Sequence, residues 1–175
     1  MSNNIEKVAV LGAGTMGAQI AGHLANAGIP SCLFDISQEL AEKGVGILTA
    51  LKPAPLYKPK NAGLIEACNY DQHLEKIKDA DWVVEAVAEN LEIKHKVYNN
   101  IMDFLKDTAI VSSNTSGIPL ADLTEVMSDD VKKRFLITHF FNPPRYMRLL
   151  ELVKGPNTSD DIYNSMAAFG EDVLG

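Results

Sequence analysis

Short apolar runs alternate along this chain with longer segments in which apolar side chains recur at helical spacing. A short apolar run between turn residues is typical of a buried strand, and the longer spacing is typical of a helix that buries one face. The runs predict strands at residues 7–11, 31–34, 82–87, 109–113, 135–141 and 149–153. The spaced segments predict helices at residues 15–27, 37–51, 91–105, 120–127 and 159–169.

The order of these elements indicates the fold class. Strands and helices alternate, and the strands are continuously apolar, which is typical of a parallel sheet with helices on both faces. Only a short segment around Asn142, Pro143 and Pro144 separates the last two strands, so we expect this pair to be antiparallel. We therefore predict an α/β, doubly wound, mostly parallel sheet with an antiparallel strand pair near the C-terminus, in one domain over residues 1–175.

One segment between the second helix and the third strand interrupts this alternation. It contains three prolines and three lysines, namely Pro53, Pro55, Pro59, Lys52, Lys58 and Lys60. Proline is excluded from helix interiors and from central strands. We expect an irregular excursion from the core here.

Composition and charge exclude several classes of protein. The chain has 175 residues, 46% of them hydrophobic and 22% charged, which is typical of a globular domain and not of a disordered one. Its net charge of −7 argues against a nucleic-acid binder, which needs clustered Lys and Arg. No apolar run approaches the roughly 20 residues of a membrane span. The two cysteines, Cys32 and Cys68, have no zinc-site or disulfide spacing, so we assign no metal and expect a cytoplasmic setting.

A glycine cluster directly follows the first strand, at Gly12, Gly14 and Gly17. In a strand-turn-helix unit these glycines allow a tight turn, the approach of a pyrophosphate and close helix packing, and the helix start offers free N–H groups. Asp35 ends the second strand, where a carboxylate accepts hydrogen bonds from ribose hydroxyls and repels a 2′-phosphate. The pattern favours NAD over NADP. The alternatives are a structural glycine turn and, for Asp35, a cap of the next helix.

His139 and Glu151 lie on the two strands that we expect to pair. A carboxylate among apolar residues needs a partner, and an imidazole is a suitable one. Glu bound to one ring nitrogen leaves the other free to accept a proton, as in an oriented general base. Spacing alone leaves open the alternative of a structural His and an unrelated Glu.

Polar residues also follow the two middle strands. Residues 113–117, Ser-Asn-Thr-Ser-Gly, come after one strand, and Glu89 and Lys94 come after another. Ligands of open parallel sheets bind outside the carboxyl ends of the strands, so we expect contacts with cofactor or substrate there. A turn with a helix cap, a helix-start acid and a solvated lysine are the alternatives.

Four motifs together resemble one family. They are Gly12-Ala13-Gly14-Thr15-Met16-Gly17, Val84-Glu85-Ala86-Val87-Ala88-Glu89-Asn90, Ser113-Asn114-Thr115-Ser116 and His139-Phe140-Phe141-Asn142-Pro143. In this order they closely resemble the NAD-binding, Rossmann-type domain of the L-3-hydroxyacyl-CoA dehydrogenases. The resemblance implies oxidation of a 3-hydroxyacyl-CoA to the 3-oxoacyl-CoA with NAD, as in fatty-acid β-oxidation.

The resemblance also implies roles for individual residues. His139 matches the catalytic base, Glu151 its orienting partner and Ser116 the serine that contacts the substrate oxygen. The positions implied on the cofactor side are Gly12, Gly14, Thr15, Met16, Gly17, Asp35, Glu89, Lys94 and Asn114. Those implied on the substrate side are Ser116, Asn142 and, more loosely, Lys52 near the phosphates of coenzyme A.

The sequence departs from the family pattern in three respects. Gly117 stands where many relatives have a second serine. Residues 52–56 and 143–146 look more like bacterial bifunctional enzymes that also carry an enoyl-CoA hydratase segment. The family's helical domain, which closes the substrate cleft and forms the homodimer, has no counterpart here, so we expect a domain of a longer protein. The alternatives are a non-catalytic NAD-binding module and a related β-hydroxyacid dehydrogenase.

Overall fold

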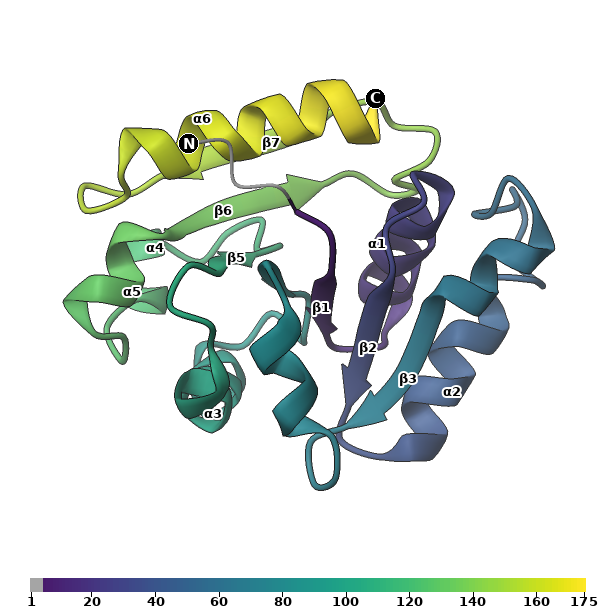
Figure 1. Cartoon of the computed structure of the whole chain (residues 1–175), viewed down its shortest axis with the longest axis horizontal. Helices are drawn as coiled ribbons and strands as arrows, with labels where there is room; N and C mark the ends of the chain where they lie inside the picture. The colour runs from purple at the N-terminus through teal and green to yellow at the C-terminus, as the bar shows by residue number, and fades with distance from the viewer. Residues whose placement is uncertain (1–4) are drawn as a thin grey trace.

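Seven strands form a single sheet in the computed structural model, which describes residues 5–175 (Figure 1). The order across the sheet is β3-β2-β1-β4-β5-β6-β7. The strands are β1 (Val8–Leu11), β2 (Ser31–Asp35), β3 (Ile65–Asn69), β4 (Trp82–Glu85), β5 (Ile110–Ser113), β6 (Phe135–Phe140) and β7 (Leu150–Lys154). All neighbours pair in parallel except β6 and β7, which are antiparallel. The predicted fold class is confirmed.

Helices connect these strands and cover the sheet. The α-helices are α1 (Thr15–Asn26), α2 (Gln38–Ile47), α3 (Leu91–Ile101), α4 (Leu120–Leu123), α5 (Asp129–Lys133) and α6 (Asp160–Phe169). Short 3-10 helices are η1 (Pro59–Leu64), η2 (Leu74–Asp79) and η3 (Met102–Phe104), and a π-helical turn, η4 (Gly170–Leu174), follows α6. In Figure 1, α2 lies along β3 and α6 along β7, at opposite ends of the sheet. No helix in residues 5–175 has the length and hydropathy to cross a membrane.

Both faces of the sheet are apolar. Along β1, Val8 and Val10 join one buried cluster while Ala9 and Leu11 join another. Successive side chains of a strand point to opposite faces, so the two clusters lie on the two sides of the sheet. This double burial explains why the strands are continuously apolar in the sequence.

The strand order reverses direction at β1. The chain moves outward from β1 through β2 to β3 and then crosses to β4 on the other side of β1. In open α/β sheets, ligands bind beyond the carboxyl ends of the strands at this reversal. The loops after β1 and β4 are therefore the expected walls of a ligand site.

The sequence prediction missed β3 and extended three helices too far. β3 pairs only with β2 and is an edge strand, and a single β-branched residue, Ile65, begins it. The helices predicted to end at Leu51, Leu105 and Met127 end earlier, at the bounds given above, and continue as turns or 3-10 segments. Periodicity does not distinguish an α-helix from the irregular turns that extend its apolar face.

The proline-rich excursion is irregular, as predicted, until η1 begins at Pro59. Two side chains from other segments attach it to the body of the domain. Asn26 at the end of α1 donates a 2.8 Å hydrogen bond to the carbonyl of Pro55 and accepts one from the Tyr57 N–H. Arg145 donates a 2.6 Å hydrogen bond to the carbonyl of Ala54. The excursion is therefore docked on the domain.

Candidate functional site

The turn between β1 and α1 has room only for glycine at two positions. Gly12 has φ +100°, and a Cβ there would lie 2.8 Å from the carbonyl oxygen of Ala86. A Cβ on Gly17 would lie 1.8 Å from the carbonyl oxygen of Gly12. At Gly14, in contrast, a Cβ meets no atom within 4 Å, and the residue is exposed. The turn therefore packs closely against the domain at Gly12 and Gly17 and is open to solvent at Gly14.

Within residues 5–175, the first turn of α1 presents N–H groups without a capping side chain beside this opening. The helix begins after Gly14, no side chain caps it, and its first turn contains no acidic residue. By contrast, α2, α3, α5 and α6 are capped by a serine or asparagine side chain. Free N–H groups and the positive end of the helix dipole suit a phosphate group. The loop and helix therefore fit the pyrophosphate of a dinucleotide.

Asp35 is attached to the same loop. Its Oδ2 accepts a 2.8 Å hydrogen bond from the N–H of Ala13, and its Oδ1 accepts one of 2.7 Å from Ile36. The alternative that Asp35 caps the next helix is wrong, because Ser37 is the N-cap of α2 and accepts from the N–H of Leu40.

A cavity of about 570 Å³ opens at the carboxyl ends of β1, β4, β5 and β6. It brings together eight of the residues that the sequence singled out: Gly14, Thr15, Met16, Glu89, Asn114, Ser116, His139 and Asn142. A neighbouring cavity of about 260 Å³ shares Ser116 and His139 with it and is also lined by Glu151. Side chains from segments far apart in the chain thus meet at one edge of the sheet.

His139 and Glu151 form the predicted contact. They are directly opposite each other in the antiparallel register of β6 and β7, and His139 Nδ1 lies 2.8 Å from Glu151 Oε2. Within residues 5–175 the other ring nitrogen, Nε2, has no hydrogen-bond partner. The expected apolar setting of Glu151 is wrong: its side chain is 52% exposed, whereas that of His139 is 20% exposed. β7 is the edge strand, so its outer residues meet solvent.

Comparison with known proteins decides the family. Residues 7–175 match the family model described as "3-hydroxyacyl-CoA dehydrogenase, NAD binding domain". The chain belongs to this family. A probable 3-hydroxyacyl-CoA dehydrogenase of Bacillus subtilis (strain 168) is 44% identical over 196 residues, covering 100% of this chain and 25% of the relative. Another, of Deinococcus radiodurans, is 44% identical and covers 98% of this chain and 51% of the relative.

Solved structures agree with this assignment. The (S)-3-hydroxybutyryl-CoA dehydrogenase PaaH1 from Ralstonia eutropha superposes with a TM-score of 0.83 at 32% identity, covering 98% of this chain and 62% of that one. FadB2 of M. tuberculosis gives a TM-score of 0.87 at 29% identity, covering 98% and 61%. The chain spans about a quarter to a half of the length of the curated relatives described above.

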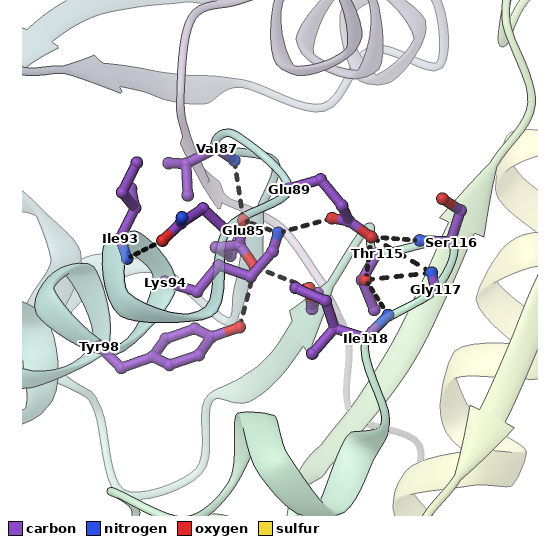
Figure 2. A network of polar contacts seen from close by, with 12 residues as sticks. Glu85, Val87, Glu89, Ile93, Lys94, Tyr98, Thr115, Ser116, Gly117 and Ile118 are labelled. Atoms are coloured by element: carbon purple, nitrogen blue, oxygen red, sulfur yellow. Dashed lines mark hydrogen bonds and ion pairs between the residues drawn. The ribbon is translucent and has the colours of Figure 1, made fainter.

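In this 3-hydroxyacyl-CoA dehydrogenase domain, Glu89 fixes the loop that carries Ser116 (Figure 2). Its Oε1 accepts hydrogen bonds from the Thr115 hydroxyl at 2.5 Å, the Ser116 N–H at 3.1 Å and the Gly117 N–H at 3.2 Å. Partial burial pushes the pKa of Glu89 upward, but these hydrogen bonds and the ammonium of Lys94 outweigh it and leave the pKa lowered. Glu89 is therefore a carboxylate that orders the loop.

Lys94 lies beneath this loop and not in solvent. Its side chain is 1% exposed, and Nζ lies 2.7 Å from Glu85 Oε1 and 3.3 Å from Glu89 Oε2. The alternative of a solvated lysine is wrong. Its ammonium group presents almost no surface to a ligand in this arrangement, and it reaches the cavity through Glu89 (Figure 2).

The sequence reasoning missed the group that holds Lys94. Glu85 is fully buried at the end of β4 and also accepts hydrogen bonds from the Tyr98 hydroxyl at 2.8 Å and the Ser113 hydroxyl at 2.6 Å (Figure 2). Burial and the Glu85 carboxylate together raise the pKa of Tyr98 well above its usual value, so the phenol stays a donor. The sequence signal that could have found Glu85 is a carboxylate inside an apolar strand run, because a buried charge needs partners.

Two asparagines connect the cavity walls. Asn114 accepts a 2.8 Å hydrogen bond from the N–H of Phe140, which joins the ends of β5 and β6. Asn142 accepts a 3.0 Å hydrogen bond from the amide of Gln19, a buried residue of α1 that the sequence analysis did not select. The amide groups of both asparagines are therefore partly committed to holding the wall together.

Lys52 lies apart from this site. It is exposed on the docked excursion and lines neither the 570 Å³ nor the 260 Å³ cavity. Its contact with a coenzyme A phosphate stays a prediction.

Proposed function

We propose that this domain supplies the NAD site and the general base for oxidation of a 3-hydroxyacyl-CoA to the 3-oxoacyl-CoA in fatty-acid β-oxidation. The observation that carries the proposal is the His139–Glu151 hydrogen bond at the cavity that also contains the open start of α1. A nucleotide site and an oriented base in one cavity are what hydride removal from an alcohol requires.

At the cofactor end, the glycine turn and the uncapped N–H groups of α1 would hold the pyrophosphate. The carboxylate of Asp35, fixed by Ala13 and Ile36, would accept hydrogen bonds from ribose hydroxyls. Bound NAD supplies the acceptor for the hydride. Asn114 and Glu89 line the same cavity and would contact the bound cofactor.

At the reacting end, His139 accepts the hydroxyl proton of the substrate on Nε2. Glu151 accepts the hydrogen bond from Nδ1–H, which fixes the tautomer and stabilises the imidazolium that forms. Ser116 is exposed at the junction of the two cavities, and its hydroxyl would donate a hydrogen bond to the substrate oxygen. Glu89 holds the backbone of that loop, so the serine needs no ordering when substrate binds. Asn142, which lines the same cavity, would contact the same substrate.

The properties of the whole protein are part of this proposal. One relative, of Idiomarina loihiensis, is named "Fatty acid oxidation complex subunit alpha"; it is 34% identical and covers 96% of this chain and 24% of its own length. This likeness supports a substrate of fatty-acid oxidation, an acyl-CoA. We assign homodimer formation to the family's helical domain. Cys32 and Cys68 are both free thiols, which suits a cytoplasmic location.

A segment exchange tests the proposed reaction. Residues 1–175 would replace the matching segment of the Bacillus subtilis relative, and the chimera would be assayed for reduction of acetoacetyl-CoA by NADH. We expect the chimera to reduce acetoacetyl-CoA with NADH and not with NADPH. A folded chimera that binds NADH but does not reduce acetoacetyl-CoA would contradict the proposed reaction and leave a nucleotide-binding module.

A further inference from the structure

The two cysteines of this chain meet although they are far apart in the sequence. β2 and β3 pair in parallel, with Cys32 opposite Glu66 and Phe34 opposite Cys68. Paired residues of neighbouring strands share a face of the sheet, and so do residues two apart. Cys32, Cys68 and Glu66 therefore point to the same side of the β2–β3 pair. Cys32 and Cys68 are 36 positions apart, and the pairing of β2 with β3 brings them together.

The donor atoms of these three side chains are close together. One ligand atom from each lies within 4.8 Å of the others, and Cys32 Sγ is 3.8 Å from Glu66 Oε2. Zinc binds thiolate at about 2.3 Å and carboxylate at about 2.0 to 2.2 Å, so tetrahedral donors are about 3.5 to 3.8 Å apart. Each donor needs a shift of less than about 1 Å to reach this spacing.

Burial and solvent access at the cluster also suit a metal ion. The cysteines are 2% and 0% exposed, whereas the Glu66 side chain is 54% exposed, so the cluster opens to solvent through Glu66. The Glu66 carboxylate is paired with the Lys76 ammonium. A divalent cation that takes Glu66 as a ligand must therefore displace this ion pair.

We propose that Cys32, Cys68 and Glu66 form a site for a thiophilic divalent cation, Zn²⁺ or Cd²⁺, with water as the fourth ligand. Binding releases the two thiol protons to solvent, and the Lys76 ammonium moves off the Glu66 carboxylate. Two thiolates, one carboxylate and water give a bound Zn²⁺ four ligands of the types it prefers. The bound ion joins edge strand β3 to β2, the strand that ends at Asp35.

Titration of the reduced chain with Cd²⁺ tests this site. The reductant must contain no thiol, and the ultraviolet thiolate-to-cadmium charge-transfer absorption reports coordination by cysteine. We expect one ion per chain and an affinity that rises with pH, because the thiols must lose protons. Competition of Zn²⁺ against a chromophoric chelator gives the affinity for zinc.

Three variants and a control locate the ligands. Loss of an outer partner alone costs about 10- to 100-fold in metal affinity, so we expect Cys32→Ser and Cys68→Ser each to lose about 100-fold or more. Glu66→Gln should lose about 10- to 100-fold. Glu75→Gln is the matched control, because Glu75 is an exposed acid nearby that pairs with Lys78. Its affinity should equal that of the unaltered chain.

Several results would overturn the proposal. These are absence of the charge-transfer absorption, a stoichiometry other than one, or serine variants that bind as the unaltered chain does. Circular dichroism and NADH titration check that each variant folds. If a serine variant does not fold, proton release by the unaltered chain decides: two protons per bound ion support the site, and none would exclude it.

Discussion

The carboxylate of Asp35 accepts a 2.8 Å hydrogen bond from the backbone N–H of Ala13, between the first two glycines of the β1–α1 turn. The acid that ends β2 and the turn that follows β1 are thus one unit. Each carboxylate oxygen has lone pairs beyond those that Ala13 and Ile36 use. Asp35 can therefore accept further hydrogen bonds from a ligand without leaving the turn.

Asp35→Asn should change the preference for the cofactor. The asparagine carbonyl can keep the bond to Ala13, but the negative charge is lost. Hydrogen bonds to charged groups contribute about 1.5 to 3 kcal/mol, so we expect NADH affinity to fall about tenfold or more. NADPH affinity should rise, because repulsion of the 2′-phosphate is removed. Calorimetric titration of the chain with each nucleotide measures both changes.

A nearby acid provides the control for this variant. Glu39 is exposed in the first turn of α2. Glu39→Gln should leave both affinities as they were. An Asp35→Asn variant whose ratio of NADH to NADPH affinity is unchanged would contradict the role of Asp35.

Two glycine substitutions should have effects of opposite sign on stability. An added Cβ at Gly17 lies 1.8 Å from a backbone oxygen, so Gly17→Ala should lower the free energy of unfolding by about 1 to 3 kcal/mol or more. At Gly46 in α2 a Cβ meets nothing within 4 Å, so Gly46→Ala should raise it by about 0.4 to 1 kcal/mol. Urea unfolding measures both values. Equal stability of the two variants would refute the close contact between α1 and the turn.

Arg145→Met should loosen the docked excursion. Arg145 donates to the carbonyls of Ala54 and Leu56 at 2.6 and 2.9 Å, and its guanidinium lies 4.5 Å from the ring centre of Tyr57. Hydrogen bonds from a charged donor contribute about 1.5 to 3 kcal/mol, so amide exchange in residues 52–58 should accelerate about tenfold or more. Arg148→Met, at an exposed arginine nearby, is the control. Equal exchange in the two variants would show that Arg145 does not hold the excursion.

Most of the fold could be predicted from the sequence because the central strands are buried on both faces. Every residue of β1, β4 and β5 is buried, so these strands show no alternation of apolar and polar residues in the sequence. β3 was missed because it lies at the edge of the sheet and contains Glu66, which faces solvent. Because β3 was not predicted, the proximity of Cys32 and Cys68 was not predicted either.

The individual residues of the candidate site could be predicted from the sequence, but the contacts and burial of their side chains could not. The pairing of the strands that carry His139 and Glu151 was predicted from the short connection between them. Spacing alone left open whether the two side chains meet, and the family resemblance favoured their contact. The burial of Lys94 could not be predicted, because it depends on the distance between β4 and α3 and on the carboxylate of Glu85. Long polar side chains are assigned to solvent by composition, but tertiary structure determines whether they are buried.

The lowered pKa of Glu89 predicts a pH dependence of stability. Because the folded-state pKa lies below the ordinary value of about 4.3, ionised Glu89 stabilises the fold above that pH. This contribution is lost as pH falls through the folded-state pKa. The difference in Tm between the unaltered chain and Glu89→Gln should therefore be largest at neutral pH and vanish in acid. A difference that stays constant from pH 7 to pH 3 would contradict the ionised carboxylate.

The rate of acetoacetyl-CoA reduction by the chimera with His139→Gln tests the central claim most directly. General base catalysis contributes about 10² to 10⁴-fold, so we expect a loss of that size with NADH binding unchanged. His95→Gln is the matched control, because His95 lies outside both cavities and bonds to the carbonyl of Asp122. A His139→Gln chimera that reduces acetoacetyl-CoA as fast as the His95→Gln chimera would show that His139 is not the base.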